Sequence, residues 1–495
     1  MTGLLTLRSL SEYARRPLNL VLLAVVPVVF VTLSAGALAE FADLLGGLTD
    51  VGTVEAASAG WAAAILAGVS GFFHVAGSRD ADRRLAAAGA GTLRVVFARL
   101  ASGFALAAVA STGALVALAA RTGLADAPRA IGATIGFAVI YLAIGAALGG
   151  VIRSEMNGSL AIIFLWMFDV FFGPAMGGTS PLIRVFPLHF PTLVVTDVAS
   201  GHAGPLGDVG LSLAWAVGAV ALAAAVLVAT TRPAPTATVR RVGSWSRLAT
   251  GLRYGLVEYR RNVVLWVLLV GLPIVFITLS FAITPDDPAP VELAEAGRRS
   301  IRVLSMVDVH GAIMGPITVG FLAGLAGLFV VLGSGDADRR LVLSGFKVRE
   351  VLGARPGVTG LAAALTTAVA LVVTAFDFTP QRWTPFIAGT LLVALTYAML
   401  GVLVGPLLGR LGGLYLMLLL PFIDAGLAQN PMFDAAPPTW AKLMPTHGAV
   451  RVLLDGAFTP GFDETGALLL ALAWLVGVTA AAAAVFRLLS APQRT

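Results

Sequence analysis

A charged stretch that occurs twice organises the whole chain. The first copy, Ser78–Leu85, reads SRDADRRL, and the second copy, Ser334–Leu341, reads SGDADRRL. The copies share the pattern S-x-D-A-D-R-R-L, lie 256 positions apart, and each stands between two long apolar runs. Charge this dense is costly inside a bilayer, so we expect both stretches to be loops in water at the membrane surface.

The composition is typical of an integral membrane protein. Of the 495 residues, 58% are hydrophobic and 12% are charged, about half the charged fraction of a soluble domain. The mean hydropathy is +0.91. The chain has no cysteine, which excludes disulfides, thiolate metal sites and a cysteine nucleophile. The net charge of +6 does not predict a nucleic-acid partner, because no basic stretch is both soluble and rich in aromatic residues.

Apolar runs predict the number of membrane crossings. A crossing helix needs about 20 mostly apolar residues. The expected fold is therefore an all-α, multi-pass membrane protein with about twelve transmembrane helices, six in each half. The predicted segments are 18–38, 56–76, 97–120, 131–151, 159–172 and 208–230, then 263–283, 312–333, 356–376, 385–404, 412–427 and 464–486.

Further matches between the halves indicate an internal repeat. Pro27–Ser34 (PVVFVTLS) matches Pro273–Ser280 (PIVFITLS) at an offset of 246. His189 and His447, each two positions after a proline, match at an offset of 258. Ordered matches with slowly drifting offsets indicate a duplicated unit. The internal copy of the first apolar run also favours a transmembrane helix there over a signal peptide.

Charge predicts the orientation and the division of the chain. With a cytoplasmic N-terminus and a crossing at every segment, 24 of the 33 Arg and Lys residues lie inside, as the positive-inside rule requires. The repeats are then parallel, and both termini are cytoplasmic in the cell membrane. We expect a first six-helix unit at 1–233, a cytoplasmic linker at 234–246 and a second unit at 247–495. Each unit is expected to begin with an amphipathic interfacial helix.

The two charged loops are the first candidate site. Aspartates there can cap a helix N-terminus and arginines can face water or lipid headgroups, so a helix cap in a positive-inside loop is one interpretation. The second is a docking surface, because membrane topology alone needs arginine but no fixed D-x-D-R-R-L order. The candidate docking residues are Asp80, Asp82, Arg83, Arg84, Asp336, Asp338, Arg339, Arg340 and Arg349.

A second candidate lies between the fifth and sixth segments of each half. These stretches are too apolar for a free loop and too broken to span, so we expect a re-entrant or interfacial outer hairpin whose backbone is buried in protein. His189 and His447 are either part of an outer gate or residues that begin a short helix. The i, i+4 spacing of Arg451 and Asp455 predicts an ion pair.

Asp169 and Asp424 stand near the outer ends of the two fifth segments. Carboxylates at membrane depth are costly and often functional, which places both residues on a candidate substrate path. Anchoring at the membrane interface explains them equally well. The sequence holds no phosphate-binding loop, no HExxH motif and no nucleophile elbow, so we expect no enzyme activity in this chain.

This plan resembles the permease subunit of the type-2 ABC exporter family, here with two six-helix units fused in one chain. The resemblance rests on the amphipathic entry helix, the charged loop after the second segment and the outer hairpin before the sixth. Asp338–Leu341 with Arg349 and Arg355, and Met444–Gly456, are similar to that family's loop and outer segment. Only Gly91-Thr92-Leu93 matches the family's acidic E-x-G-T-L start of that loop.

The resemblance implies a permease without its own cofactor. Two cytoplasmic ABC ATPase subunits, which carry the ATP and magnesium, would dock on the charged loops, and the outer hairpins would help to gate a path for a hydrophobic or amphipathic substrate. The alternative is a major-facilitator-type secondary transporter driven by an ion gradient, to which Gly77 and Asp82–Arg84 bear a weaker likeness.

Overall fold

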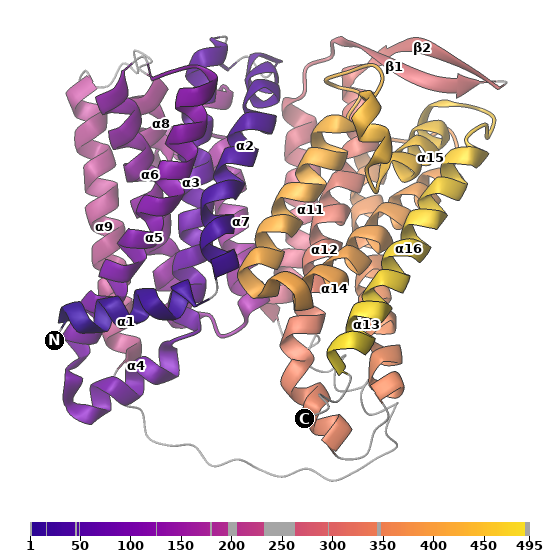
Figure 1. The fold of residues 1–495 in the computed structure, drawn as a ribbon. Coiled ribbons are helices and arrows are strands. Elements are labelled where there is room, and N and C mark those ends of the chain that lie inside the picture. The colour runs from indigo at the N-terminus through magenta and orange to yellow at the C-terminus, as the bar shows by residue number, and fades with distance from the viewer. Residues whose placement is uncertain are drawn as a thin grey trace. The chain divides into compact units, whose positions relative to one another are not determined.

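The computed structural model describes residues 2–15, 17–44, 47–48, 50–124, 126–178, 181–196, 205–231, 263–295, 297–343 and 348–490. The chain forms two compact units, Met1–Arg241 and Val242–Thr495, each of which is described by itself (Figure 1). The predicted linker 234–246 and the second predicted interfacial helix lie outside the described residues.

The first unit is helical throughout its described residues. Its elements are α1 (Thr2–Ala14), α2 (Pro17–Leu44), α3 (Val51–Ala76), α4 (Arg79–Leu85), the π-helical turn η1 (Ala86–Ala90), α5 (Thr92–Arg121), α6 (Ala127–Val151), α7 (Glu155–Phe171), the 3-10 turns η2 (Pro174–Met176) and η3 (Pro181–Val185), α8 (His189–Thr196) and α9 (Pro205–Thr231). The predicted interfacial helix is α1, which packs against α5 and α2.

The second unit contains helices and one small sheet. Its elements are α11 (Val263–Ile283), β1 (Pro288–Glu295), β2 (Arg298–Ser305), α12 (Met306–Leu343), α13 (Val348–Asp377), α14 (Trp383–Pro421), the π-helical turn η4 (Phe422–Ala428), the 3-10 turn η5 (Thr439–Leu443), α15 (His447–Phe458) and α16 (Thr465–Ser490).

Among the described residues, nine helical segments are long and apolar enough to cross a membrane, so this is a multi-pass membrane protein. They lie in α2, α3, α5, α6, α9, α12, α13, α16 and the continuous stretch Trp383–Ala428. Two predicted crossings fall on shorter helices: α7 has 17 residues, and α11 contributes the apolar helix Leu269–Ala282.

The longest apolar stretch, Trp383–Ala428, reverses direction. Its residue Gly409 has a φ of 68° and a ψ of −166°, a conformation that favours glycine. The hydroxyl of Tyr397 bonds to the carbonyl of Leu420 and to Asp424, although a straight helix would separate Tyr397 from Asp424 by about 40 Å. The stretch therefore folds back on itself, and it contains the two predicted segments 385–404 and 412–427.

The described residues are almost entirely helical, as expected, and one small sheet is a feature that the sequence did not predict. Strands β1 and β2 form an antiparallel hairpin, the only sheet among the described residues. This hairpin joins α11 to α12, whereas the corresponding link from α2 to α3 in the first unit has room for no such element. Inserted residues at this point also explain why the offset between the halves rises from 246 at Pro27 and Pro273 to 256 at the charged loops.

Glycines bring the central helices of each unit into close contact. A Cβ placed on Gly145 of α6 would lie 1.9 Å from the carbonyl oxygen of Gly68 on α3. The same approach joins α14 to α12, where a Cβ on Gly401 would lie 2.1 Å from the oxygen of Gly324. Small residues at a crossing let two backbones approach within the bilayer. Both pairs are related by an offset of 256, so the duplication extends to this helix crossing.

Candidate functional site

The charged loop of the first unit folds into helix α4, which is bonded to the ends of two long helices. Arg79 donates to the carbonyls of Gly149 and Ile152 at the C-terminus of α6. Arg83 donates to the carbonyl of Thr230 near the C-terminus of α9, at 2.8 Å. A guanidinium at a helix C-terminus satisfies carbonyls that have no partner within the helix and favours the negative end of the dipole. These two arginines therefore hold α4 against the bundle.

Asp82 ties the same loop to a third long helix. Its side chain is buried, and its two carboxylate oxygens accept from Arg99 of α5 at 2.6 and 3.1 Å. Arg99 also donates to the hydroxyl of Ser9 on α1, at 2.6 Å. The bidentate geometry makes this a strong and directional contact. One carboxylate thus joins α4, α5 and the helix α1, and α1 and α4 lie at the same end of the unit (Figure 1).

The predicted docking residues of this loop divide into two groups. Asp82 and Arg83 turn toward the bundle, which corrects the expectation that Arg83 simply faces solvent or headgroups. Asp80 and Arg84 are exposed. The carboxylate of Asp80 lies 3.9 Å from the guanidinium of Arg83, which makes this a weak ion pair. The sequence could not predict which of these side chains face the bundle, because that depends on which side of the short helix α4 packs against α6 and α9.

Two glycines make the chain turn from α4 into α5. Gly89 and Gly91 have φ values of 92° and 80°, which an L side chain adopts only with strain. Gly91 is the N-cap of α5, and the residues Thr92 to Arg99 form its first turns. Leu93 and Phe97 are exposed there.

In the second unit, Asp336, Asp338, Arg339 and Arg340 lie on the last turns of α12, and Arg349 lies on the first turn of α13. The side chains of these predicted docking residues are outside the part of the chain that the structure describes.

Asp169 and Asp424 have equivalent surroundings in the two units. Asp169 accepts from the hydroxyl of Tyr141 on α6 and from the backbone N–H of Leu188, at 3.1 Å. Asp424 accepts from the hydroxyl of Tyr397 at 2.8 Å and from the backbone N–H of Thr446 at 3.1 Å. Both carboxylates are buried, at 2% and 0% exposed, so they do not anchor the protein at an exposed interface.

Each aspartate therefore bonds two parts of its unit. A carboxylate at the end of the fifth segment holds the fourth segment through a tyrosine and the outer hairpin through an amide. The tyrosines were missed in the sequence, although Tyr141 and Tyr397 stand 256 positions apart, the offset of the charged loops. That shared offset was the signal that could have found them.

The two histidines begin the short helices of the outer hairpins. His189 is the first residue of α8 and His447 is the first residue of α15. Both side chains are buried, and His447 Nδ1 lies 2.9 Å from the Gln429 side-chain oxygen. The interpretation of these histidines as helix-starting residues is confirmed. Most residues of both helices are buried in protein.

Arg451 does not pair with Asp455, which corrects the i, i+4 prediction. Its guanidinium donates to the carbonyl of Glu292 on β1 at 2.9 Å and to the Glu292 carboxylate. Asp455 instead accepts from the hydroxyl of Thr459 at 2.9 Å. The spacing rule failed because Glu292 belongs to the inserted strand pair, 159 positions earlier in the chain.

Charge around this pair shifts two pKa values. Burial opposes the charged form of Glu292, but the hydrogen bond and charge of Arg451, with Arg299 and Lys442, outweigh it and lower the pKa of Glu292. Burial, and then the charges of Arg451, Arg299 and Lys442, lower the pKa of His447 to about 4. His447 is therefore neutral at neutral pH.

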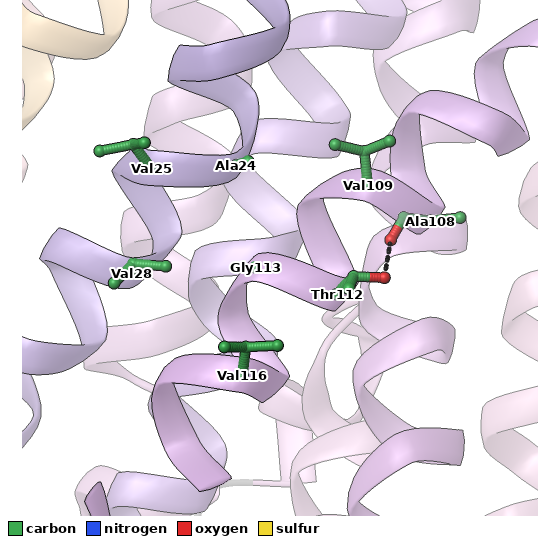
Figure 2. A pocket seen from close by; sticks show the side chains of 8 residues that line it. All are labelled: Ala24, Val25, Val28, Ala108, Val109, Thr112, Gly113 and Val116. Carbon is green, nitrogen blue, oxygen red and sulfur yellow. Dashed lines mark hydrogen bonds between the residues drawn. The ribbon is translucent and has the colours of Figure 1, made fainter. Parts of the chain in front are cut away.

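A shallow apolar groove of about 470 Å³ lies between α2 and α5 (Figure 2). The two helices come into close contact beside it, where a Cβ on Gly113 would lie 2.5 Å from the carbonyl oxygen of Ala24. The hydroxyl of Thr112 bonds to the Ala108 carbonyl of its own helix, at 2.8 Å. The groove thus offers apolar contacts and no polar group aimed at a ligand.

Among the described residues, no cluster of three or more His, Asp or Glu side chains could hold a metal ion. Comparison with protein-family models and with curated protein sequences finds no match to this chain.

Proposed function

We propose that this chain is the membrane-spanning permease of an ABC exporter, driven by separate ATPase subunits that dock on the α4 end of the first unit and on the equivalent loop of the second. The observation that carries the proposal is the attachment of α4. Arg79, Arg83 and Asp82 bond it to α6, α9 and α5, while Asp80 and Arg84 point away from these contacts into solvent.

Such a loop is suited to transmit force. A short helix bonded to three long helices and to α1 moves them together when it is displaced, because charge-assisted hydrogen bonds resist sliding. A loop whose charges all faced solvent would bend instead. The two outward charges of opposite sign, Asp80 and Arg84, would give a docking protein a fixed orientation.

The energy source would be the partner. The chain has no G-x-x-x-x-G-K-[ST] sequence to bind nucleotide phosphates, so ATP and magnesium would be held by the ATPase subunits, two copies for two loops. We place the α4 end in the cytoplasm, because the positive-inside rule assigns most arginines to that side. Both units would then stand parallel, as six crossings each, in the cell membrane.

The substrate would be hydrophobic or amphipathic. The membrane-crossing helices are strongly apolar, with a mean hydropathy of 2.2 for the stretch Trp383–Ala428 and 2.3 for Thr465–Phe486. A path with such walls favours compounds with large apolar parts over small ions.

The proposal is tested by measuring the ATP hydrolysis of ATPase subunits that co-purify with the permease. The tagged chain is purified in detergent from the membranes of its own cells, and magnesium-dependent, vanadate-sensitive ATP hydrolysis is measured in the product. We expect Arg84→Glu and Asp80→Arg to remove most of this activity. Arg184→Glu, the same charge change on the exposed turn η3 at the other end of the unit, is the control and should retain it. Wild-type protein without ATP hydrolysis, or equal activity in Arg84→Glu, would contradict the proposal.

A secondary transporter remains the second candidate, and one observation favours it. Buried carboxylates within the membrane region, such as Asp169 and Asp424, occur in proton relays. Their bonds to tyrosines and backbone amides favour a structural role instead. Transport of a fluorescent amphipathic dye into vesicles that have an ion gradient but no ATP would support this alternative.

A further inference from the structure

The outer hairpins of the two units differ in one respect that the duplication does not predict. In the second unit, Arg451 of α15 is 4% exposed and holds Glu292 of β1 by two hydrogen bonds. In the first unit, the position 258 residues earlier is Leu193, and no strand is present among that unit's described residues.

The strand pair is fastened to three parts of the second unit's outer end. The backbone N–H of Glu292 donates to the carbonyl of Ala435, between η4 and η5, at 2.8 Å. Arg299 of β2 lies 3.6 Å from the Glu292 carboxylate and 3.7 Å from Glu464, the residue before α16. Together with the bonds from Arg451 on α15, these contacts join the strand pair β1–β2, α15 and the start of α16 in one network.

We infer that Arg451 is a positioning residue that clamps α15 of the second unit through Glu292, so that α15 separates from its neighbours less often than α8 does in the first unit. This inference rests on the proposed transport function for its meaning, but the clamp can be tested without an ATPase.

Opening the pair would leave the buried guanidinium of Arg451 without its countercharge, so the pair should open rarely. In the first unit, Leu188 is bonded to Asp169, and Leu193, at the place of Arg451, cannot form an ion pair. Its helix α8 should therefore separate from its neighbours more often than α15 does.

The chain provides a direct measurement, because it has no natural cysteine. Thr192 on α8 and Val450 on α15 are equivalent at an offset of 258, and they are 1% and 2% exposed. Thr192→Cys and Val450→Cys are each purified, placed in nanodiscs that expose both membrane faces, and reacted with a water-soluble maleimide in the absence of ATP.

We expect Thr192→Cys to react about tenfold faster than Val450→Cys, and Arg451→Leu to raise the rate of Val450→Cys about tenfold or more without changing that of Thr192→Cys. Glu292→Gln, which keeps Arg451 and the side-chain shape, should raise the Val450→Cys rate in the same direction and decides the matter if Arg451→Leu does not fold. Arg302→Leu is the control, because Arg302 pairs only within the strand hairpin, with Glu295 at 2.7 Å. Equal rates for the two cysteines, or no effect of both clamp substitutions, would overturn the inference. Failure of the ATPase measurement alone would leave the clamp intact and overturn only the proposed function.

Discussion

The hydroxyl of Tyr397 lies 2.8 Å from a carboxylate oxygen of Asp424, 27 positions later in the chain. The tyrosine stands on one arm of the stretch that reverses at Gly409 and the aspartate at the end of the other arm. The same carboxylate accepts the backbone N–H of Thr446 at the start of the outer hairpin. Tyr141 and Asp169 repeat this arrangement in the first unit.

Tyr397→Phe should destabilise the protein by about 1–3 kcal/mol, because it leaves a buried carboxylate short of one donor. Thermal unfolding in detergent, followed by loss of the monodisperse chromatographic peak, measures the effect. Asp424→Asn combined with Tyr397→Phe should cost less than the sum of the single changes, since both remove one shared interaction. Strictly additive losses would show that the two side chains do not stabilise each other.

Asp82→Asn should be strongly destabilising, by about 3–5 kcal/mol, because Arg99 then loses its buried countercharge. The matched control is Asp80→Asn in the same helix, at a side chain that is 86% exposed. We expect the control to leave the melting temperature unchanged. Similar losses in both variants would mean that the loop is not held by its buried charge.

Stability should fall as the pH is lowered from about 6.5 toward 4, in part because of His447. Its folded-state pKa is lowered to about 4, below the pKa of the same group in the unfolded chain. As the pH falls, the unfolded chain therefore binds the proton first and is stabilised relative to the folded chain. Arg451, Arg299, Lys442 and Glu292 are the charged groups around this ring.

His447→Gln should reduce the loss of melting temperature between pH 6.5 and 5, because the replacement cannot take up a proton there. Glu292 contributes little in this interval, since its pKa lies below the ordinary value for a glutamate and its charge persists. An unchanged pH slope in the variant would assign the effect to other groups.

Gly145→Ala should destabilise the first unit by about 1–3 kcal/mol, because the new methyl group would overlap the carbonyl of Gly68 and force α3 and α6 apart. Gly218→Ala on α9 is the control: nothing lies within 4 Å of its added Cβ, and alanine favours the helix. Protease resistance in detergent compares the two. If both variants resist equally, the close helix crossing does not limit stability.

The sequence predicted the membrane class, the position of the apolar segments and the existence of a repeat. These features follow from the length of apolar runs and from fixed offsets, both of which are local or countable. The same reasoning found that His189 and His447 begin short helices, because proline and a buried helix start leave a local pattern.

The partners of the charged side chains could not be predicted from the sequence. Spacing along one helix suggested Asp455 for Arg451, yet the arginine binds Glu292 on a strand pair that the all-α expectation did not include. Arg83 was expected to face water or headgroups, yet it donates to Thr230, 147 positions later. Such contacts depend on which helix ends meet in space, so they are set by packing and not by any neighbouring residue.

The sequence by itself determined that this chain enters a membrane many times, because apolar runs of this length are stable as helices that cross the bilayer. Tertiary structure alone decided the inward direction of Asp82 and Arg83, the bonding of Asp169 and Asp424 to tyrosines, and the contact of Arg451 with Glu292. In an apolar surrounding a buried charge must find a partner wherever the fold supplies one, and the fold supplies it at long range.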